Sequence, residues 1–242
     1  MISLKWLALY TAILATPQVC SAGLITLDFN LDTAQLVTSP AGPFSIDFQF
    51  IDGSGTGDAN NTLSIGSFDF GGGSPTWSAA LTCGVTGDLS SGVSMIDSSF
   101  FNELTQEFAP GSSVSFQLTS TTNVDSGGVP DEFSFAILDG TGVEIPTQGL
   151  ASVGSDVFLD LIVDSATSPS VWSFASDPGR SPAAGGGPIT TGPPTVTETA
   201  AGTPVPEPST LILLGAAVAF IVTLRRLELG VQQLAVRSKG VQ

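Results

Sequence analysis

The segment between residues 52 and 61 gathers side chains of the kind that bind hard cations. It reads Asp-Gly-Ser-Gly-Thr-Gly-Asp-Ala-Asn-Asn and lies between two runs of alternating apolar residues. Ca²⁺ takes roughly six to eight oxygen ligands, which Asp, Asn and loop carbonyl groups supply. Asp52, Asp58 and Asn60 are therefore the candidate ligands if this loop binds Ca²⁺, although the spacing is not that of an EF-hand. The alternative is an ordinary solvated turn, because Gly, Asp, Asn and Ser also favour turns.

The composition restricts catalysis largely to carboxylates. The chain has no His, and between residues 23 and 204 it has no Lys or Tyr. Catalytic Ser-His-Asp, Cys-His and Lys nucleophiles are therefore excluded there, as are His-ligated zinc, iron and copper sites. The adjacent Asp131 and Glu132 are the remaining candidates for a glycosidase, but neighbours on a strand point to opposite faces. We therefore expect no enzyme.

Cys83, Trp77 and Trp172 are predicted to be core residues. Cys83 and Trp77 share the parity of one alternating apolar run, and Trp172 lies two residues from Phe174. Because Cys20 falls in a predicted signal peptide, a single thiol would remain in the mature chain and no internal disulfide is expected. The alternative for the tryptophans is an exposed surface on which sugars stack, which would indicate a carbohydrate-binding module.

Alternation of apolar and polar residues predicts β-strands along residues 23–175. Examples are the runs 25–31, 44–50, 114–118 and 133–137. The alternation changes phase at Gly66-Ser67, which predicts a β-bulge. Residues 100–108 suit either a short helix or an irregular strand. Because no long segment has helical periodicity, we expect an all-β fold, an antiparallel two-sheet sandwich of jelly-roll-like type with a phenylalanine-rich core.

The N-terminal region and the region after residue 175 are predicted to lie outside this domain. Residues 1–22 combine a basic residue, a ten-residue apolar run and small residues at the end. This pattern predicts a signal peptide that signal peptidase cleaves between Ala22 and Gly23. Residues 176–204 are rich in Pro, Gly and Thr and are predicted to form a linker without a packed core.

The C-terminal region contains a Pro-Glu-Pro motif, an apolar segment and a basic pair, in that order. These parts are Pro206, Glu207 and Pro208, residues 209–224, and Arg225 and Arg226. Sixteen helical residues span about 24 Å, so the apolar segment predicts a marginal transmembrane helix. The basic pair favours a cytoplasmic C-terminal side and places the domain outside the inner membrane.

This arrangement resembles the PEP-CTERM sorting domain of Gram-negative bacteria over residues 205–226. The resemblance implies retention in the inner membrane, processing by an exosortase-type enzyme and delivery to the cell surface or extracellular matrix. Residues 227–242 extend beyond the usual end of the family, and we predict that sorting does not need them. The runs 43–55, 68–73 and 130–139 also resemble an uncharacterised group of PEP-CTERM proteins, which provides no catalytic residue to transfer.

Acidic residues dominate the domain, and this limits its partners. The formal net charge is −16, and Arg180 is the one basic residue between residues 23 and 204. Such a surface repels nucleic acid and attracts divalent cations. We therefore expect an exported, non-enzymatic structural or adhesive protein. The alternatives are a carbohydrate-binding module that contacts surface polysaccharide, with or without bound Ca²⁺, and a carboxylate-dependent glycosidase.

Overall fold

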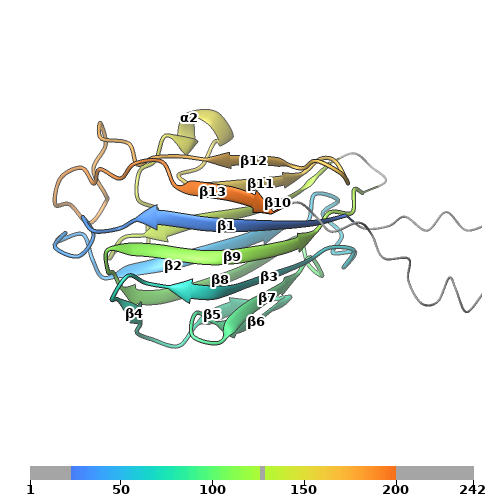
Figure 1. The fold of residues 1–242 in the computed structure, drawn as a ribbon, viewed down its shortest axis with the longest axis horizontal. Coiled ribbons are helices and arrows are strands. Elements are labelled where there is room, and N and C mark those ends of the chain that lie inside the picture. Colours follow the sequence, from blue (N-terminus) through green and yellow to red (C-terminus); the bar gives the residue numbers. More distant parts are fainter. Residues whose placement is uncertain (1–22, 126–128, 200–242) are drawn as a thin grey trace, which may run out of the picture. The chain divides into compact units, whose positions relative to one another are not determined.

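The computed structural model describes residues 23–125 and 129–199. This part of the chain forms two antiparallel β-sheets and one short helix, α2 (Gly149–Val153) (Figure 1). The prediction of an all-β fold with two antiparallel sheets is confirmed for these residues.

The first sheet, sheet A, has six strands. In spatial order they are β13 (Thr195–Thr199), β1 (Leu24–Asp32), β9 (Ser113–Thr121), β3 (Thr62–Asp69), β7 (Gly92–Ile96) and β6 (Val85–Asp88). The second sheet, sheet B, has seven strands. They are β12 (Ser170–Ser173), β11 (Leu159–Val163), β10 (Asp131–Leu138), β2 (Phe44–Ile51), β8 (Phe101–Ala109) and β4 (Ser74–Pro75), while β5 (Ala80–Thr82) also pairs with β8. The chain passes from sheet A to sheet B and back along β1, β2 and β3, and from sheet B to sheet A and back along β8, β9 and β10. The loops that connect the two sheets therefore lie at the ends of the sandwich.

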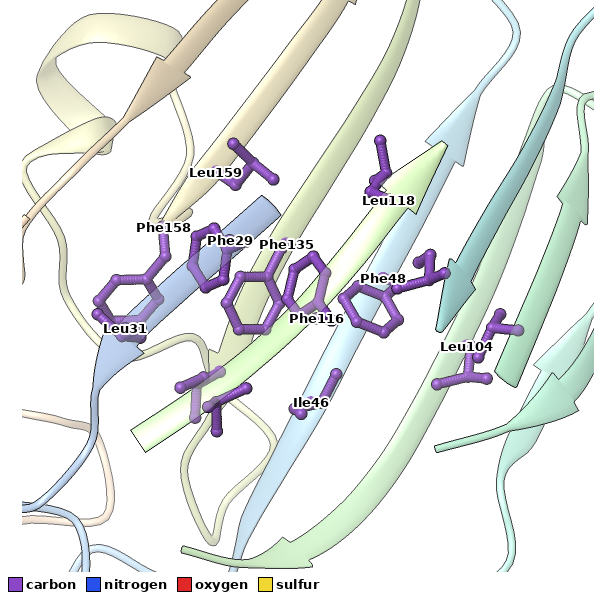
Figure 2. Close-up of a cluster of buried hydrophobic side chains, with 14 of the residues drawn as sticks. Phe29, Leu31, Ile46, Phe48, Leu104, Phe116, Leu118, Phe135, Phe158 and Leu159 are labelled. Atoms are coloured by element: carbon purple, nitrogen blue, oxygen red, sulfur yellow. The ribbon is translucent and has the colours of Figure 1, made fainter. Parts of the chain in front are cut away.

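The core lies between the two sheets and is dominated by phenylalanine, as the alternation predicts. Phe29 of β1 stacks on Phe116 of β9 with ring centroids 4.7 Å apart. Phe116 meets Phe48 and Phe135 of sheet B edge-on, at 5.4 Å each (Figure 2). All four side chains are buried. Each such ring contributes about 1.5–3 kcal/mol by leaving water, and each aromatic pair adds about 0.5–1.5 kcal/mol.

Two local predictions about strands can be compared with the structure. The register between β3 and β9 shifts between Gly66 and Asp69, and Ser67 has a φ of 54°, which confirms the predicted bulge. For residues 100–108 the sequence allowed either a short helix or an irregular strand, and the segment forms the strand β8. This strand pairs with β2 on one side and with β4 and β5 on the other. Pairing on both sides explains why this strand is regular.

The prediction that Trp77, Trp172 and Cys83 are core residues is wrong. Trp77 is 70% exposed, Trp172 is 44% exposed, and Cys83 is also exposed. Trp77 lies between β4 and β5, and Trp172 lies on β12, so both tryptophans occupy the edges of sheet B. Alternation shows that a strand has two faces, but at a sheet edge it does not show which face another layer covers.

The predicted linker 176–204 is also wrong for its described part, 176–199. β13 pairs with β1 and extends sheet A, and the side chain of Ile189 is buried in the core. Pro and Gly disfavour regular structure, but they do not prevent an irregular segment from packing against a sheet that has already formed. Residues 200–204 lie outside the described part.

Several predictions fall on residues that the structure does not describe. These are the signal peptide 1–22 with Ala22, the Pro-Glu-Pro motif, the apolar segment 209–224, the basic pair and the extension 227–242. Gly23 is described, and its carbonyl accepts a hydrogen bond from the backbone N–H of Thr122 at 3.0 Å. Within the described residues, no helix is long and apolar enough to cross a membrane.

Candidate metal centre

Three carboxylates meet at one end of the sandwich. Asp52 directly follows β2, Asp125 lies in the connection between β9 and β10, and Asp131 is the first residue of β10. One carboxylate oxygen of each lies within 4.8 Å of the other two. Asp52 and Asp131 are buried and Asp125 is partly buried. This is the end where β1 begins and β13 finishes (Figure 1).

The carboxylate of Asp52 organises the loop that follows it. Its Oδ1 accepts hydrogen bonds from the backbone N–H groups of Ser54 (2.7 Å) and Gly55 (3.1 Å) and from the Ser54 hydroxyl (2.7 Å). Its Oδ2 accepts hydrogen bonds from the backbone N–H groups of Gly57 (2.5 Å) and Asp58 (3.2 Å). Burial alone would raise the pKa of Asp52, but these hydrogen bonds outweigh burial and hold the pKa below its usual range.

Asn61 connects the cluster to a fourth carboxylate, Asp97, which directly follows β7. The backbone N–H of Asn61 donates to Asp97 Oδ2 at 3.0 Å, and its side-chain Nδ2 donates to Asp131 Oδ2 at 2.6 Å. Asp97 is fully buried. Burial raises the pKa of Asp97 to about 7, against the opposing effect of the Asn61 N–H, and the nearby Asp131 raises it further.

Gly57 allows the loop after β2 to approach the connection that carries Asp97. It has a φ of 69°, and a Cβ at this position would lie 2.5 Å from the carbonyl oxygen of Ser98. A side chain is therefore excluded both by the backbone conformation and by the available space. The glycine-rich composition of the loop has a direct role in bringing Asp52 and Asp97 to the same end of the sandwich.

Several oxygens around the cluster are buried and accept no hydrogen bond. They are Asp97 Oδ1, Asp125 Oδ2 and Asn60 Oδ1. The amide nitrogen of Asn60 donates to Asp58 Oδ2 at 3.1 Å and to Asp125 Oδ1, which fixes Asn60 beside the cluster. Buried polar atoms normally have a partner, so these three unpaired oxygens call for a bound water, a shared proton or an ion.

No basic side chain of the described residues neutralises this group of carboxylates. Arg180 is the only Lys or Arg within 23–125 and 129–199. Its guanidinium binds Asp156 and Asp177 instead, at 2.5 and 2.8 Å. The negative charge of the cluster must therefore be balanced by protons or by a cation from solution.

The sequence predicted Asp52, Asp58 and Asn60 as metal ligands, and the structure groups them differently. Asp52 belongs to the cluster, and Asn60 lies beside it through its bond to Asp125. Asp58 is exposed, and its carboxylate accepts hydrogen bonds from the backbone and side chain of Asn60. The prediction missed Asp97, Asp125 and Asp131, which come from other loops. Asp97 and Asp131 lie at strand ends. An acidic residue directly at the end of a predicted strand was the sequence feature that could have identified them.

A second turn of similar sequence serves as an internal comparison. Asp139 accepts hydrogen bonds from the N–H and hydroxyl of Thr141 (2.8 and 2.6 Å) and from the N–H of Ala184 (2.7 Å). Burial would raise the pKa of Asp139, but these bonds lower it. No other acidic side chain of the described residues forms a ligand cluster with it. The Asp-Gly-Ser/Thr-Gly pattern therefore marks a capped turn, and the neighbouring acids distinguish the Asp52 site.

The adjacent carboxylates considered for a glycosidase lie on opposite faces of β10. Asp131 joins the loop cluster, whereas Glu132 lies on the outer face of sheet B beside Asp160 of β11. Burial raises the pKa of Asp160 to about 7, and the nearby Glu132 adds to this effect. The two members of the predicted pair therefore do not face one substrate.

Comparisons with known proteins identify one part of the chain. Residues 204–226 match the family model of the PEP-CTERM protein-sorting motif. Comparison with curated proteins and with solved structures finds no match. The motif supports an exported, membrane-associated protein that exosortase-type machinery processes. The chain therefore carries a PEP-CTERM protein-sorting motif at residues 204–226.

Proposed function

We propose that the chain is a cell-surface or extracellular-matrix protein of a Gram-negative bacterium with a structural or adhesive β-sandwich that has no enzymatic activity. The observation that carries this proposal is the sorting motif at residues 204–226, which follows the folded domain directly. The acidic composition of the domain supports it, because a high net charge keeps a surface-exposed chain soluble.

The side chains of the domain support a non-enzymatic role. Residues 23–199 contain no His, Lys or Tyr, so the usual bases and most activated nucleophiles are missing. Carboxylates remain, but Asp131 and Glu132 face different sides of β10. The single thiol, Cys83, is exposed on a turn, and its domain has only one basic residue with which to stabilise a thiolate.

Localisation of the full chain with and without an exosortase tests this function. The chain is expressed in a Gram-negative host, and an antibody against the sandwich follows it in inner-membrane, surface and medium fractions. We expect a shortened form at the surface or in the medium when the exosortase is present, and an uncut form in the inner membrane when it is absent. A variant with Ala at positions 206–208 should behave like the strain without the enzyme. The same distribution in all three cases would contradict the proposal.

A second candidate function is glycan binding, which the exposure of both tryptophans favours. Trp77 and Trp172 are 70% and 44% exposed, and exposed aromatic rings suit stacking on sugars. They lie at opposite edges of sheet B, five strand spacings or about 24 Å apart. They therefore represent two separate contact points and not one continuous surface.

A glycan array with single variants separates this candidate from a purely structural role. If glycan binding is the function, Trp77→Ala or Trp172→Ala should lose binding. Phe100→Ala is the matched control, because Phe100 is also an exposed aromatic residue, at 59%. Absence of binding by the unmodified chain, or equal loss in all three variants, would remove this candidate.

A further inference from the structure

We propose that Asp52, Asp125 and Asp131 bind one calcium ion, with the side-chain oxygen of Asn60 as a further ligand and Asp97 as a positioning residue. The proposal goes beyond sorting and adhesion, because it assigns a ligand to the loops at one end of the sandwich. It differs from the site predicted from the loop sequence, since two of its four ligands, Asp125 and Asp131, come from outside that loop.

The arrangement of charge indicates a cation. Three carboxylates converge within 4.8 Å, two of them buried, and their charges repel one another unless a positive charge lies between them. The one basic residue of the described part, Arg180, is bound to Asp156 and Asp177. The hydrogen bonds of its own loop stabilise the charge of Asp52, and a cation from solution is the available positive partner for the cluster as a whole.

Buried side-chain oxygens without a hydrogen bond also indicate a bound cation. Asp97 is fully buried, and its Oδ1 accepts no hydrogen bond, while Asn61 holds its other oxygen and bridges it to Asp131. Asp125 Oδ2 and Asn60 Oδ1 are also buried without a partner. Asp97 and Asn60 are not among the three residues that define the cluster, so their unpaired oxygens are a separate observation. A coordinated ion with its water molecules would satisfy them.

The ligand chemistry favours Ca²⁺ over other divalent cations. All the available ligands are oxygens, and the described residues contain no His that a transition metal would prefer. With metal–oxygen distances of 2.3–2.6 Å, Ca²⁺ can bridge oxygens up to about 5 Å apart, which accommodates the spacing in the cluster. Mg²⁺ demands a near-octahedral geometry at 2.0–2.1 Å and usually keeps several of its waters, so a site built mainly from protein oxygens suits it less.

An ion at this position would join three connections of the sandwich. Asp52 and Asn60 belong to the β2–β3 connection, Asp125 and Asp131 lie at the β9–β10 connection, and Asn61 links Asp97 of the β7–β8 connection to them. Because β13 finishes at this end, the ion would stabilise the part of the domain from which the chain continues toward the sorting motif.

Calcium titration of the full chain tests the proposal. The chain is purified in detergent, freed of metal with EDTA and titrated with CaCl₂ in a calorimeter and in thermal melts. Extracellular calcium modules have dissociation constants of roughly 10⁻⁴–10⁻³ M, so the titration extends to about tenfold above this range. We expect one ion per chain and a thermal midpoint that rises with calcium concentration. Absence of a rise, or an equal rise with Mg²⁺ at the same concentrations, would overturn the proposal.

Asp125→Asn distinguishes a ligand from a general effect of negative charge. It should weaken calcium binding by about tenfold or more, because ligand charge sets affinity at such sites. Asp28→Asn, at an exposed position on β1, removes the same charge and should leave binding within about twofold. In EDTA, Asp125→Asn should melt no lower than the unmodified chain, because it removes like-charge repulsion. Equal weakening in both variants, or a lower EDTA midpoint for Asp125→Asn, would contradict the assignment.

Discussion

At the scale of residues, the domain contains buried acids whose charge no basic side chain balances. Burial raises the pKa values of Asp47, Asp97 and Asp160 to about 7 each, and each has at least one buried oxygen without a hydrogen bond. In the unfolded chain an Asp has a pKa near 3.8. The folded state therefore holds more protons than the unfolded state between about pH 4 and pH 7, so stability falls as the pH rises through this range.

Asp160→Asn should remove part of this loss of stability. The side chain is fully buried, and neither of its oxygens accepts a hydrogen bond. We expect the variant to gain stability relative to the unmodified chain as the pH rises, reaching roughly 1–4 kcal/mol at pH 8, since one pKa unit corresponds to about 1.4 kcal/mol. Urea unfolding at a series of pH values in EDTA measures the difference. Asp28→Asn, at an exposed site, should leave the profile unchanged, and an unchanged profile for Asp160→Asn would show that this carboxylate is not the cause.

Single residues were predicted well where their environment is local. The alternation identified the buried phenylalanines, including Phe48 and Phe135, because strands that pair on both sides have one face toward the core. It failed for Trp77 and Cys83, since β5 lies at the edge of sheet B and Cys83 has a φ of 53° in the turn that follows. The covered face of an edge strand depends on elements far away in the sequence.

At the scale of elements, the segment 176–199 closes one side of the sandwich through strand pairing and through Arg180. The guanidinium of Arg180 donates to both carboxylate oxygens of Asp156, to Asp177 and to the carbonyl oxygen of Thr147. These bonds fasten the segment to Thr147, which precedes α2, and to Asp156, which follows it. The segment is therefore part of the domain and not a spacer.

Arg180→Met should loosen this segment. The change leaves the mostly buried carboxylate of Asp156 without its charged partner, so we expect the free energy of unfolding to fall by about 1–3 kcal/mol. Arg180→Lys keeps the charge but cannot form the bidentate contact with Asp156, so its free energy of unfolding should fall by an intermediate amount. Urea unfolding measures both, and limited proteolysis within 181–194 shows whether the segment has detached. Equal stability of all three chains would mean that strand pairing alone holds the segment.

The same segment shows why some elements escape prediction. Residues 195–199 read Thr-Val-Thr-Glu-Thr, and their β-branched residues favour a strand. The surrounding Pro and Gly suggested a linker, and nothing local shows that β1 has an open edge for β13 to pair with. The bulge at Gly66-Ser67 was predictable for the opposite reason, because the change of phase lies within the strand itself.

At the scale of the whole molecule, an acidic β-sandwich precedes a sorting motif that ends at residue 226. The candidate calcium site lies at the end of the sandwich where β13 finishes. Asp52 and Asn60 were predicted from the loop sequence, whereas Asp97, Asp125 and Asp131 were missed. The bonds that join Asn61 to Asp97 and Asp131 span 36 and 70 residues, so only the completed fold brings these side chains together.

Truncation after Arg226 should leave sorting intact. The matched motif ends at this residue, so the extension 227–242 adds nothing that the family model requires. The fraction of chain at the cell surface, followed with an antibody against the sandwich, should equal that of the full chain. Truncation after Leu224, which also removes the basic pair, is the control and should lose membrane retention. Loss of surface delivery on truncation after Arg226 would mean that the extension is a working part of the sorting signal.

The intact mass of the chain recovered from the cell surface or medium tests the central claim most directly. Cells that contain an exosortase should yield a chain that begins at Gly23 and retains the whole sandwich through Thr199. That chain should lack the apolar segment 209–224 and everything after it. A surface chain whose mass still includes residues 209–242, or the same mass in cells without the enzyme, would contradict sorting through the PEP-CTERM motif.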